Sequence, residues 1–282
     1  MDENRNSNIS SEHSEELLNI IENFRLMDDT FMSKVFEDKA CAELLLRVIL
    51  NRDDLTVVRV VSQFELKNLQ GRSARLDIYA IDEHGKQYDV EVQRSDDGAA
   101  PSRARYNSSL LDANLLNPGD KFDELPESYI IFITEHDVLK GGKPLYTVNR
   151  TISELDHAIF TDGSHIIYVN GEIRNGTALG ELMQDFFCKD PREMHYKVLS
   201  DRAGYFKKDK EGVDTMCKLM EDYADKRARQ AAEAAAEKAA KERSISIATN
   251  LWNKGERDLQ QIADLTDLPL DEVKKLFEGK TA

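Results

Sequence analysis

The apolar residues of the first fifty positions recur at a helical spacing. Between Asp29 and Leu50 they return every three or four residues, which places them on one face of a helix. These residues are Phe31, Val35, Phe36, Leu44, Leu45, Val48 and Ile49. Asp28 or Asp29 is suited to cap the first turn, because a short acidic side chain accepts hydrogen bonds from the free backbone N–H groups there. The pattern predicts an amphipathic helix over residues 29–50.

Strand-like segments follow, with one helical segment among them. The segments rich in β-branched and apolar residues are 56–66, 75–82, 87–93, 128–134 and 165–170. The runs at 128–134 and 165–170 are continuously apolar, as is typical of buried strands. Residues 101–116 begin with a proline and continue with a helical periodicity, which predicts a helix. This order of elements indicates an α/β sheet covered by helices.

A three-residue loop, Glu83-His84-Gly85, joins the second and third predicted strands. Such a loop forms a type I turn that is closed by a glycine in the left-handed conformation. The turn fixes the pairing of the two strands, so that Asp77 lies directly opposite Glu91. Opposed residues have Cβ atoms roughly 4.5–5.5 Å apart. The other face of this hairpin is apolar and carries Leu76, Ile78, Ala80, Val90 and Val92.

The polar face of the same hairpin carries candidate chemistry. Opposed carboxylates repel each other, and a hard divalent cation that prefers oxygen ligands would compensate this repulsion. Bound Mg²⁺ or Mn²⁺ would polarise a water molecule and neutralise charge on a scissile phosphate. Gln93 points to the same face as Glu91 and is placed to orient that water or a phosphate oxygen. The alternative interpretation is an ordinary solvent-facing strand pair.

The last hundred residues are predicted to be helical. Residues 177–188 and 191–205 form helices, and residues 213–250 form one long helix rich in alanine and in charges of both signs. This long helix lacks a full apolar seam, so it is an exposed connector or one partner of a loose coiled coil. The final segment is similar to a helix-turn-helix, and a packing or oligomerisation element is the alternative to a DNA-reading one.

These patterns divide the chain into four parts. We expect a polar N-terminal tail at residues 1–24, whose first fifteen residues are disordered, and an α/β domain at 25–205. A long charged helix at 206–250 and a small helical element at 251–282 complete the chain. Assembly through the long helix would make the protein a homo-oligomer.

Composition limits the kinds of partner. The formal net charge of −15 disfavours a protein that coats phosphate backbones, so any nucleic-acid contact must be local or mediated by metal. The three cysteines are widely spaced, as suits reduced thiols rather than disulfides. No apolar run is long enough to span a membrane, and the N-terminus lacks the features of a secretory signal. We therefore expect a cytoplasmic protein with no membrane partner.

Several stretches resemble one known family. VFEDKACAELLLRVIL, RLDIYAIDEHGKQYDVEVQRSD, RARYNSSLLDANLLNPGDKF and HIIYVNG are similar to the recombination-promoting nucleases and transposases of the PD-(D/E)XK superfamily, over about residues 25–200. The resemblance implies an α/β fold with a PD-(D/E)XK nuclease core, a mixed sheet flanked by helices, here followed by an α-helical C-terminal extension. It implies a metal-dependent DNA endonuclease in which Asp77 and Glu91 bind Mg²⁺ or Mn²⁺. Gln93 takes the place of the superfamily's lysine and carries no positive charge.

The resemblance also implies an acid from the first helix. Asp28, Asp29, Glu37 and Glu43 are all candidates, and the alternative for each is capping or a solvated helix surface. The helix that follows Glu91 carries the candidate DNA contacts Arg103, Arg105 and Tyr106, and Arg94 lies just after Gln93. A salt-bridged surface helix is the alternative interpretation of these cations.

Two functions of different classes follow from the sequence. The first is the metal-dependent DNA endonuclease, associated with recombination or mobile elements. The second is a catalytically weak or inactive nuclease-fold module that interacts with partners through its C-terminal helix. The opposed Asp77 and Glu91 favour the enzyme, whereas Gln93 and the acidic composition favour the inactive module.

Overall fold

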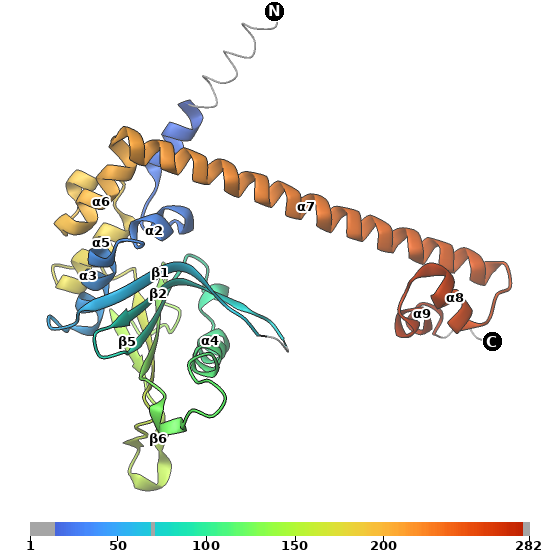
Figure 1. The fold of residues 1–282 in the computed structure, drawn as a ribbon, viewed down its shortest axis with the longest axis horizontal. Helices are drawn as coiled ribbons and strands as arrows, with labels where there is room; N and C mark the ends of the chain where they lie inside the picture. Colours follow the sequence, from blue (N-terminus) through green and yellow to red (C-terminus); the bar gives the residue numbers. More distant parts are fainter. Residues whose placement is uncertain (1–14, 69–70, 279–282) are drawn as a thin grey trace, which may run out of the picture. The chain divides into compact units, whose positions relative to one another are not determined.

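The computed structural model describes residues 15–68 and 71–278, so part of the expected N-terminal tail, residues 1–14, lies outside the described residues. The chain divides into two compact units, Met1–Lys218 and Leu219–Ala282. The first unit contains a mixed sheet with helices on both faces, and the second consists of helices (Figure 1).

The sheet of the first unit has six strands in the order β1-β2-β3-β4-β8-β5. Its strands are β1 (Val57–Leu66), β2 (Ala74–Asp82), β3 (Gln87–Gln93), β4 (Ser128–Thr134), β8 (Ser164–Asn170) and β5 (Leu145–Val148). β1, β2 and β3 pair antiparallel, β3, β4 and β8 pair parallel, and β5 closes the edge antiparallel to β8. All five predicted strands are present. β5 and the small sheet of β6 (Thr151–Ile152) and β7 (Ala158–Ile159) were not predicted.

The predicted helix over residues 29–50 is in fact two helices. α2 spans Asp29–Val35 and α3 spans Lys39–Leu50. Asp38 causes the break, because its side chain accepts hydrogen bonds from the backbone N–H groups of Ala40 and Cys41 and so caps a new helix. Asp28 is at the N-cap position of α2, but its side chain makes no capping hydrogen bond.

Helices cover the sheet on both faces. α4 (Pro101–Ala113) connects β3 to β4, and its residues Ala104, Leu110 and Leu111 pack against Ile130 and Phe132 of β4. On the other face lies α3, with α5 (Ala178–Phe187) and α6 (Lys197–Lys208) beside it (Figure 1). Short 3₁₀ turns complete this unit at η1 (Asp96–Ala99), η2 (Phe122–Glu124), η3 (Ser153–Leu155) and η4 (Pro191–Glu193).

Residues 15–24 of the expected polar tail contain a helix and contacts with the first unit. Residues 15–23 are helical, and the side chain of Ile21 is 1% exposed. The buried Lys207 of α6 donates hydrogen bonds from Nζ to the carbonyl oxygens of Glu22, Phe24 and Lys189. One lysine therefore ties the segment after this helix to the body of the first unit.

The second unit has a small hydrophobic core of its own. α7 (Lys210–Asn253) runs through the boundary between the units, and α8 (Leu259–Thr266) and α9 (Leu270–Phe277) follow it. Trp252 stacks on Phe277 with ring centroids 4.4 Å apart, and Ile262 and Val273 are fully buried beside them. None of the described helices is long and apolar enough to cross a bilayer. The architecture is the mixed sheet with flanking helices and a helical C-terminal extension that the sequence predicted.

Candidate active site

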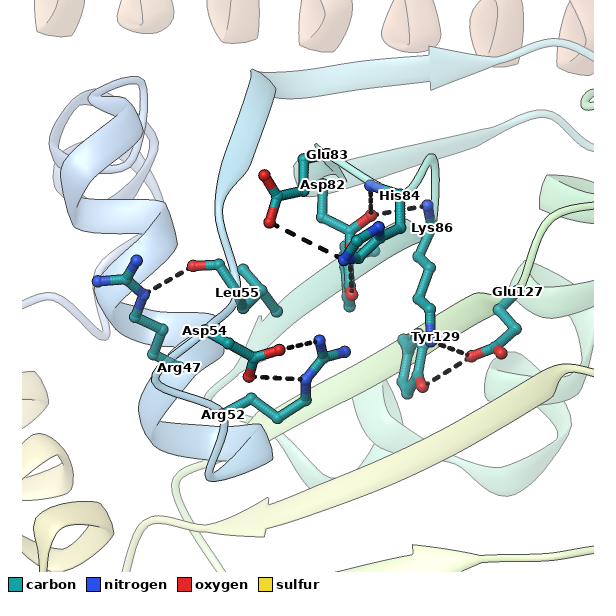
Figure 2. Close-up of polar contacts among 11 residues, drawn as sticks. Arg47, Arg52, Asp54, Leu55, Asp82, Glu83, His84, Lys86, Glu127 and Tyr129 are labelled. Carbon is teal, nitrogen blue, oxygen red and sulfur yellow. Dashed lines mark hydrogen bonds and ion pairs between the residues drawn. The ribbon is translucent and has the colours of Figure 1, made fainter.

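The turn between β2 and β3 sets the register of the site, and Figure 2 shows its polar contacts. Asp82 Oδ1 accepts hydrogen bonds from the backbone N–H groups of His84 and Lys86, both at 2.9 Å. The other oxygen of Asp82 accepts from the Tyr88 hydroxyl at 2.8 Å. Gly85 has a φ of +80°, the left-handed conformation that the sequence predicted for this position.

This turn produces the predicted strand pairing. Ile78 is opposite Val90, and the same register, extended by one residue, places Asp77 opposite Glu91. The backbone pairing of the two strands ends at Ile78 and Val90. Beyond that point the backbone N–H of Val92 donates to Asp77 Oδ2 at 3.0 Å, so the Asp77 carboxylate continues the ladder where the backbone pairing stops.

Three carboxyl groups are buried on this face of the hairpin. The residues Asp77, Asp89 and Glu91 are 9%, 0% and 0% exposed. The sequence analysis did not single out Asp89. The signal for it was present, because Asp89 lies two residues before Glu91 on the same strand and therefore points to the same face. The site is more acidic and more deeply buried than the pair expected from sequence.

Burial and mutual repulsion raise the pKa of all three groups. Burial, and then the charge of Asp29, raise the pKa of Asp77 to about 6, although the Val92 N–H and Arg103 oppose the shift. Burial and the charge of Asp77 raise the pKa of Glu91 to about 8, again opposed by Arg103. Burial, followed by the charges of Glu91 and Asp77, raises the pKa of Asp89 well above its usual range. The site therefore carries uncompensated negative charge whenever all three groups ionise.

A guanidinium and an amide contact Glu91 directly. Arg103 Nη2 of α4 lies 2.5 Å from Glu91 Oε2, and Gln93 Nε2 donates to the same oxygen at 3.1 Å. Arg103 Nη1 donates to Gln93 Oε1 at 3.3 Å and to the carbonyl oxygen of Gly98 at 3.0 Å. The structure therefore brings Glu91, Gln93 and Arg103 together, as the sequence analysis expected for the first two.

Asn107, one turn further along α4, contacts the two deepest acids. Its Nδ2 lies 3.3 Å from Asp89 Oδ2 and 3.4 Å from Glu91 Oε1. The other oxygen of Asp89, Oδ1, is buried and has no hydrogen-bond partner among the described residues. A buried carboxylate oxygen without a donor is costly, and burial also raises the pKa of Asp89.

Of the four candidate acids on the first helix, Asp29 is the one whose charge acts on the site. It raises the pKa of both Asp77 and Glu91. Gln63 Nε2 donates to Asp29 Oδ1 at 3.1 Å. Gln63 falls between the pairs Ser62–Ile78 and Phe64–Leu76 of the β1–β2 register and has a φ of +53°, a conformation uncommon for residues other than glycine. This local irregularity in β1 brings the Gln63 amide to Asp29.

The other three acids have partners elsewhere. Asp28 pairs with Arg25 and Arg94, and Glu37 pairs with Lys34. Glu43 accepts from the backbone N–H of Val57 at 2.9 Å and pairs with Arg47. Their interactions support the packing of the helices and the start of β1.

The remaining candidate DNA contacts lie at different places around the site. Arg94 is 56% exposed and pairs with Asp28 and Glu135. Arg105 is exposed on α4. The Tyr106 hydroxyl donates to the carbonyl oxygen of Arg72 and accepts from Asn68 Nδ2 at 3.2 Å, so this ring holds the end of the β1–β2 hairpin against α4.

The chemistry of the donor set fits a hard divalent cation. Asp77, Asp89 and Glu91 offer only oxygen atoms, which Mg²⁺ and Mn²⁺ prefer. Within residues 15–68 and 71–278, no group of three or more acidic, histidine or cysteine side chains is arranged to enclose an ion. Mg²⁺ is usually held by one or two carboxylates together with water and substrate phosphates. Asp77 and Glu91 fit this kind of open site.

Comparison with known proteins identifies the family of this chain. The model of the PD-(D/E)XK nuclease family transposases matches residues 32–177, which is more than half of the chain. The chain belongs to this family, whose nucleases generally use divalent metals. No curated protein and no solved structure matches it.

Proposed function

We propose that this protein is a Mg²⁺- or Mn²⁺-dependent DNA endonuclease that acts in recombination or on mobile elements. The observation that carries the proposal is the buried pair of Asp77 and Glu91, held opposite each other by the β2–β3 turn. The family supports the same conclusion. Acidic side chains buried side by side destabilise a fold, and a cation that they bind would compensate this cost.

Each residue of the site has a distinct task under this proposal. Asp77 and Glu91 would hold the divalent ion, which when bound supplies an activated water and neutralises charge on the phosphate. The Val92 N–H fixes the orientation of the Asp77 carboxylate. The Gln93 amide donates a hydrogen bond to Glu91 and accepts one from Arg103. These two bonds fix the amide, which in turn positions Glu91 and Arg103 relative to each other.

Four exposed cations lie on α4, on β2 and in the connection between β1 and β2, despite the net charge of −15. We call the exposed cations Lys67, Arg72, Arg75 and Arg105 the arm surface. They form no ion pairs with the residues that the structure describes. Lys67 and Arg72 lie in the connection between β1 and β2, Arg75 lies on β2, and Arg105 lies on α4. Tyr106 anchors the end of this hairpin to α4, which carries Arg105. Charge complementarity makes this surface the proposed path of the DNA backbone.

A metal titration tests the proposal. Wild-type protein should bind Mn²⁺ in a calorimeter and nick supercoiled plasmid when Mg²⁺ or Mn²⁺ is present. Asp77→Ala should lose both properties, and EDTA should stop the wild-type reaction. Nicking of the same extent by wild type and Asp77→Ala would mark the activity as a contaminant.

The second candidate is an inactive nuclease-fold module that assembles through its C-terminal helix. The pairing of Glu91 with Arg103 favours it, because a guanidinium already neutralises one carboxylate without metal. This candidate predicts no cleavage of any DNA form, together with a homo-oligomer whose assembly requires α7. Sedimentation of the full chain at several concentrations tests the oligomer, and a cytoplasmic location is proposed for either function.

A further inference from the structure

The active-site strand brings no positive charge to a strongly acidic site. Asp77, Asp89 and Glu91 are buried together, and Gln93 is neutral. Arg103 is the cation in direct contact with this strand, through Glu91 on one side and Gln93 on the other. Its charge lowers the pKa of all three carboxyl groups. The positive charge that contacts this strand therefore comes from α4, because β3 itself carries no cation.

Three acceptors fix the position of this guanidinium. Nη1 contacts Gln93 Oε1 and the Gly98 carbonyl oxygen, and Nη2 contacts Glu91 Oε2. Gly98 makes the arrangement possible, because a Cβ at this position would lie 2.1 Å from Gln93 Oε1. The Arg103 side chain is 39% exposed, whereas Glu91 is fully buried, so the guanidinium lies between the buried carboxylate and solvent.

We propose that Arg103 is the exchangeable cation of the site: it holds Glu91 in the metal-free protein, and a divalent ion must displace it from Glu91 Oε2. The displaced guanidinium, still beside Gln93, then serves the scissile phosphate, where a planar donor fork suits phosphate oxygens. This inference rests on the proposed nuclease function. It assigns Arg103 two effects of opposite sign, weaker metal binding and faster cleavage.

Arg103→Met tests the exchange, because it removes the charge and keeps most of the side-chain volume. Mn²⁺ should bind about tenfold more tightly in calorimetry, since the competing ion pair at Glu91 is gone. Plasmid nicking should fall by on the order of 10²–10³, as when one positioned donor to a developing charge is lost. Arg103→Lys keeps a charge without the fork, so its Mn²⁺ affinity and its nicking rate should lie between those of wild type and Arg103→Met.

Two double variants show whether the changes in Mn²⁺ affinity and in nicking arise from the contact of Arg103 with Glu91. Gln93→Lys in the Arg103→Met background returns a cation to the site and should recover much of the nicking. In a Glu91→Gln background Mn²⁺ binding should already be weak, and Arg103→Met should not tighten it, because the negative charge for which Arg103 and the ion compete is gone. Lys121→Met is the control for charge alone: Lys121 is an exposed cation in the segment after α4, outside the site and the arm surface, and its variant should leave Mn²⁺ affinity at the wild-type value.

Three results would overturn the inference. Weaker Mn²⁺ binding and a lower melting temperature in Arg103→Met, without recovery by Gln93→Lys, would make Arg103 a structural link between α4 and β3. Faster nicking by Arg103→Met would show that Arg103 only blocks the metal site and does not contact the phosphate. Unchanged Mn²⁺ affinity would rule out competition. If wild type does not nick DNA at all, the nuclease proposal fails, but the Mn²⁺ titrations still decide whether Arg103 and metal compete for Glu91.

Discussion

At the scale of single residues, the site depends on one side chain that is neutral and held at both ends. Gln93 donates to Glu91 and accepts from Arg103, and Gly98 leaves just enough room for its amide. An amide in this position contributes through geometry, because it has both a donor and an acceptor but no charge. Gln93 can therefore be perturbed without a change in the charge of the site.

Gln93→Ala should slow plasmid nicking by on the order of 10²–10³ while Mn²⁺ affinity changes little, because the metal carboxylates stay in place. Gly98→Ala offers a second route to the same effect, since the new methyl group collides with Gln93 Oε1 and turns the amide away. Both variants should be measured for nicking and for Mn²⁺ binding. A loss of Mn²⁺ binding as large as the loss of cleavage would show that Gln93 is needed for the metal site itself.

At the scale of elements, the β2–β3 hairpin could be predicted from the sequence because its determinants are local. The turn residues, the glycine and the alternation of faces all lie within residues 76–92, and they specify the register that places Asp77 opposite Glu91. The contacts of Arg103 and the role of Asp29 could not be predicted in the same way. They depend on how α4 and α2 pack against the sheet, which no local pattern encodes.

Other differences between prediction and structure have similar causes. The break between α2 and α3 had a local signal in the capping residue Asp38, but the apolar periodicity on both sides of it favoured one continuous helix. β5, β6 and β7 are short and lie at edges, so their sequences lack the apolar runs that mark buried strands. Asp89 was not predicted as a site residue, because acidic side chains are rarely fully buried.

The turn itself can be tested. Asp82→Ala should lower the free energy of unfolding by about 2–3 kcal/mol, because two backbone N–H groups and the Tyr88 hydroxyl lose their acceptor in a buried position. Urea denaturation measures this change. Glu83→Ala, at an exposed position of the same turn, is the control and should stay within about 0.5 kcal/mol of wild type. Equal losses in the two variants would mean that Asp82 does not hold the turn.

The arm surface has its own prediction. Lys67→Gln combined with Arg72→Gln should weaken binding to duplex DNA and reduce the slope of log affinity against log salt by about 1–2, as expected for two lost phosphate contacts. Mn²⁺ affinity should stay unchanged. Lys140→Gln, an exposed cation in the loop after β4, serves as the control for net charge. An unchanged salt dependence in the double variant would place the DNA elsewhere.

At the scale of the whole molecule, the buried acids link folding to pH. The pKa of Asp77 is raised to about 6 and that of Glu91 to about 8, mainly by burial, whereas the same groups titrate near about 4 in an unfolded chain. Between about pH 4.5 and 8 the folded, metal-free protein therefore holds more protons than the unfolded one. The stability contributed by these protons is fully present below the pKa of the groups in the unfolded chain. It is lost as the pH rises through their pKa values in the folded protein.

The melting temperature of the metal-free protein should accordingly fall from pH 5 to pH 8. Saturating Mg²⁺ should raise it more at pH 8 than at pH 5, because ionised carboxylates bind the ion and protonated ones do not. Asp77→Asn combined with Glu91→Gln should flatten both effects. Thermal unfolding in EDTA and in Mg²⁺ at the two pH values measures them, and identical curves for wild type and the double variant would contradict the assignment of these groups.

The two compact units suggest where the chain can be divided. Met216 of α7 is fully buried and belongs to the first unit, which ends at Lys218. We propose that a chain ending at Lys218 folds cooperatively and retains Mn²⁺ binding, whereas one ending at residue 212 loses Met216 and melts at a lower temperature. Circular dichroism during heating compares the two truncations. Failure of the longer one to fold would show that the first unit needs the C-terminal helices.

The central claim is that Asp77 and Glu91 form a metal-dependent nuclease centre. The most direct measurement is the rate of Mg²⁺-dependent nicking of supercoiled plasmid by wild type and by Asp77→Asn, purified side by side. Asparagine keeps an oxygen that can accept from the Val92 N–H and removes only the charge, so the fold should be preserved. The account predicts that wild type nicks the plasmid and that Asp77→Asn does not, although the variant melts no lower than wild type in EDTA. Equal rates, or no nicking by wild type with either Mg²⁺ or Mn²⁺, would contradict it.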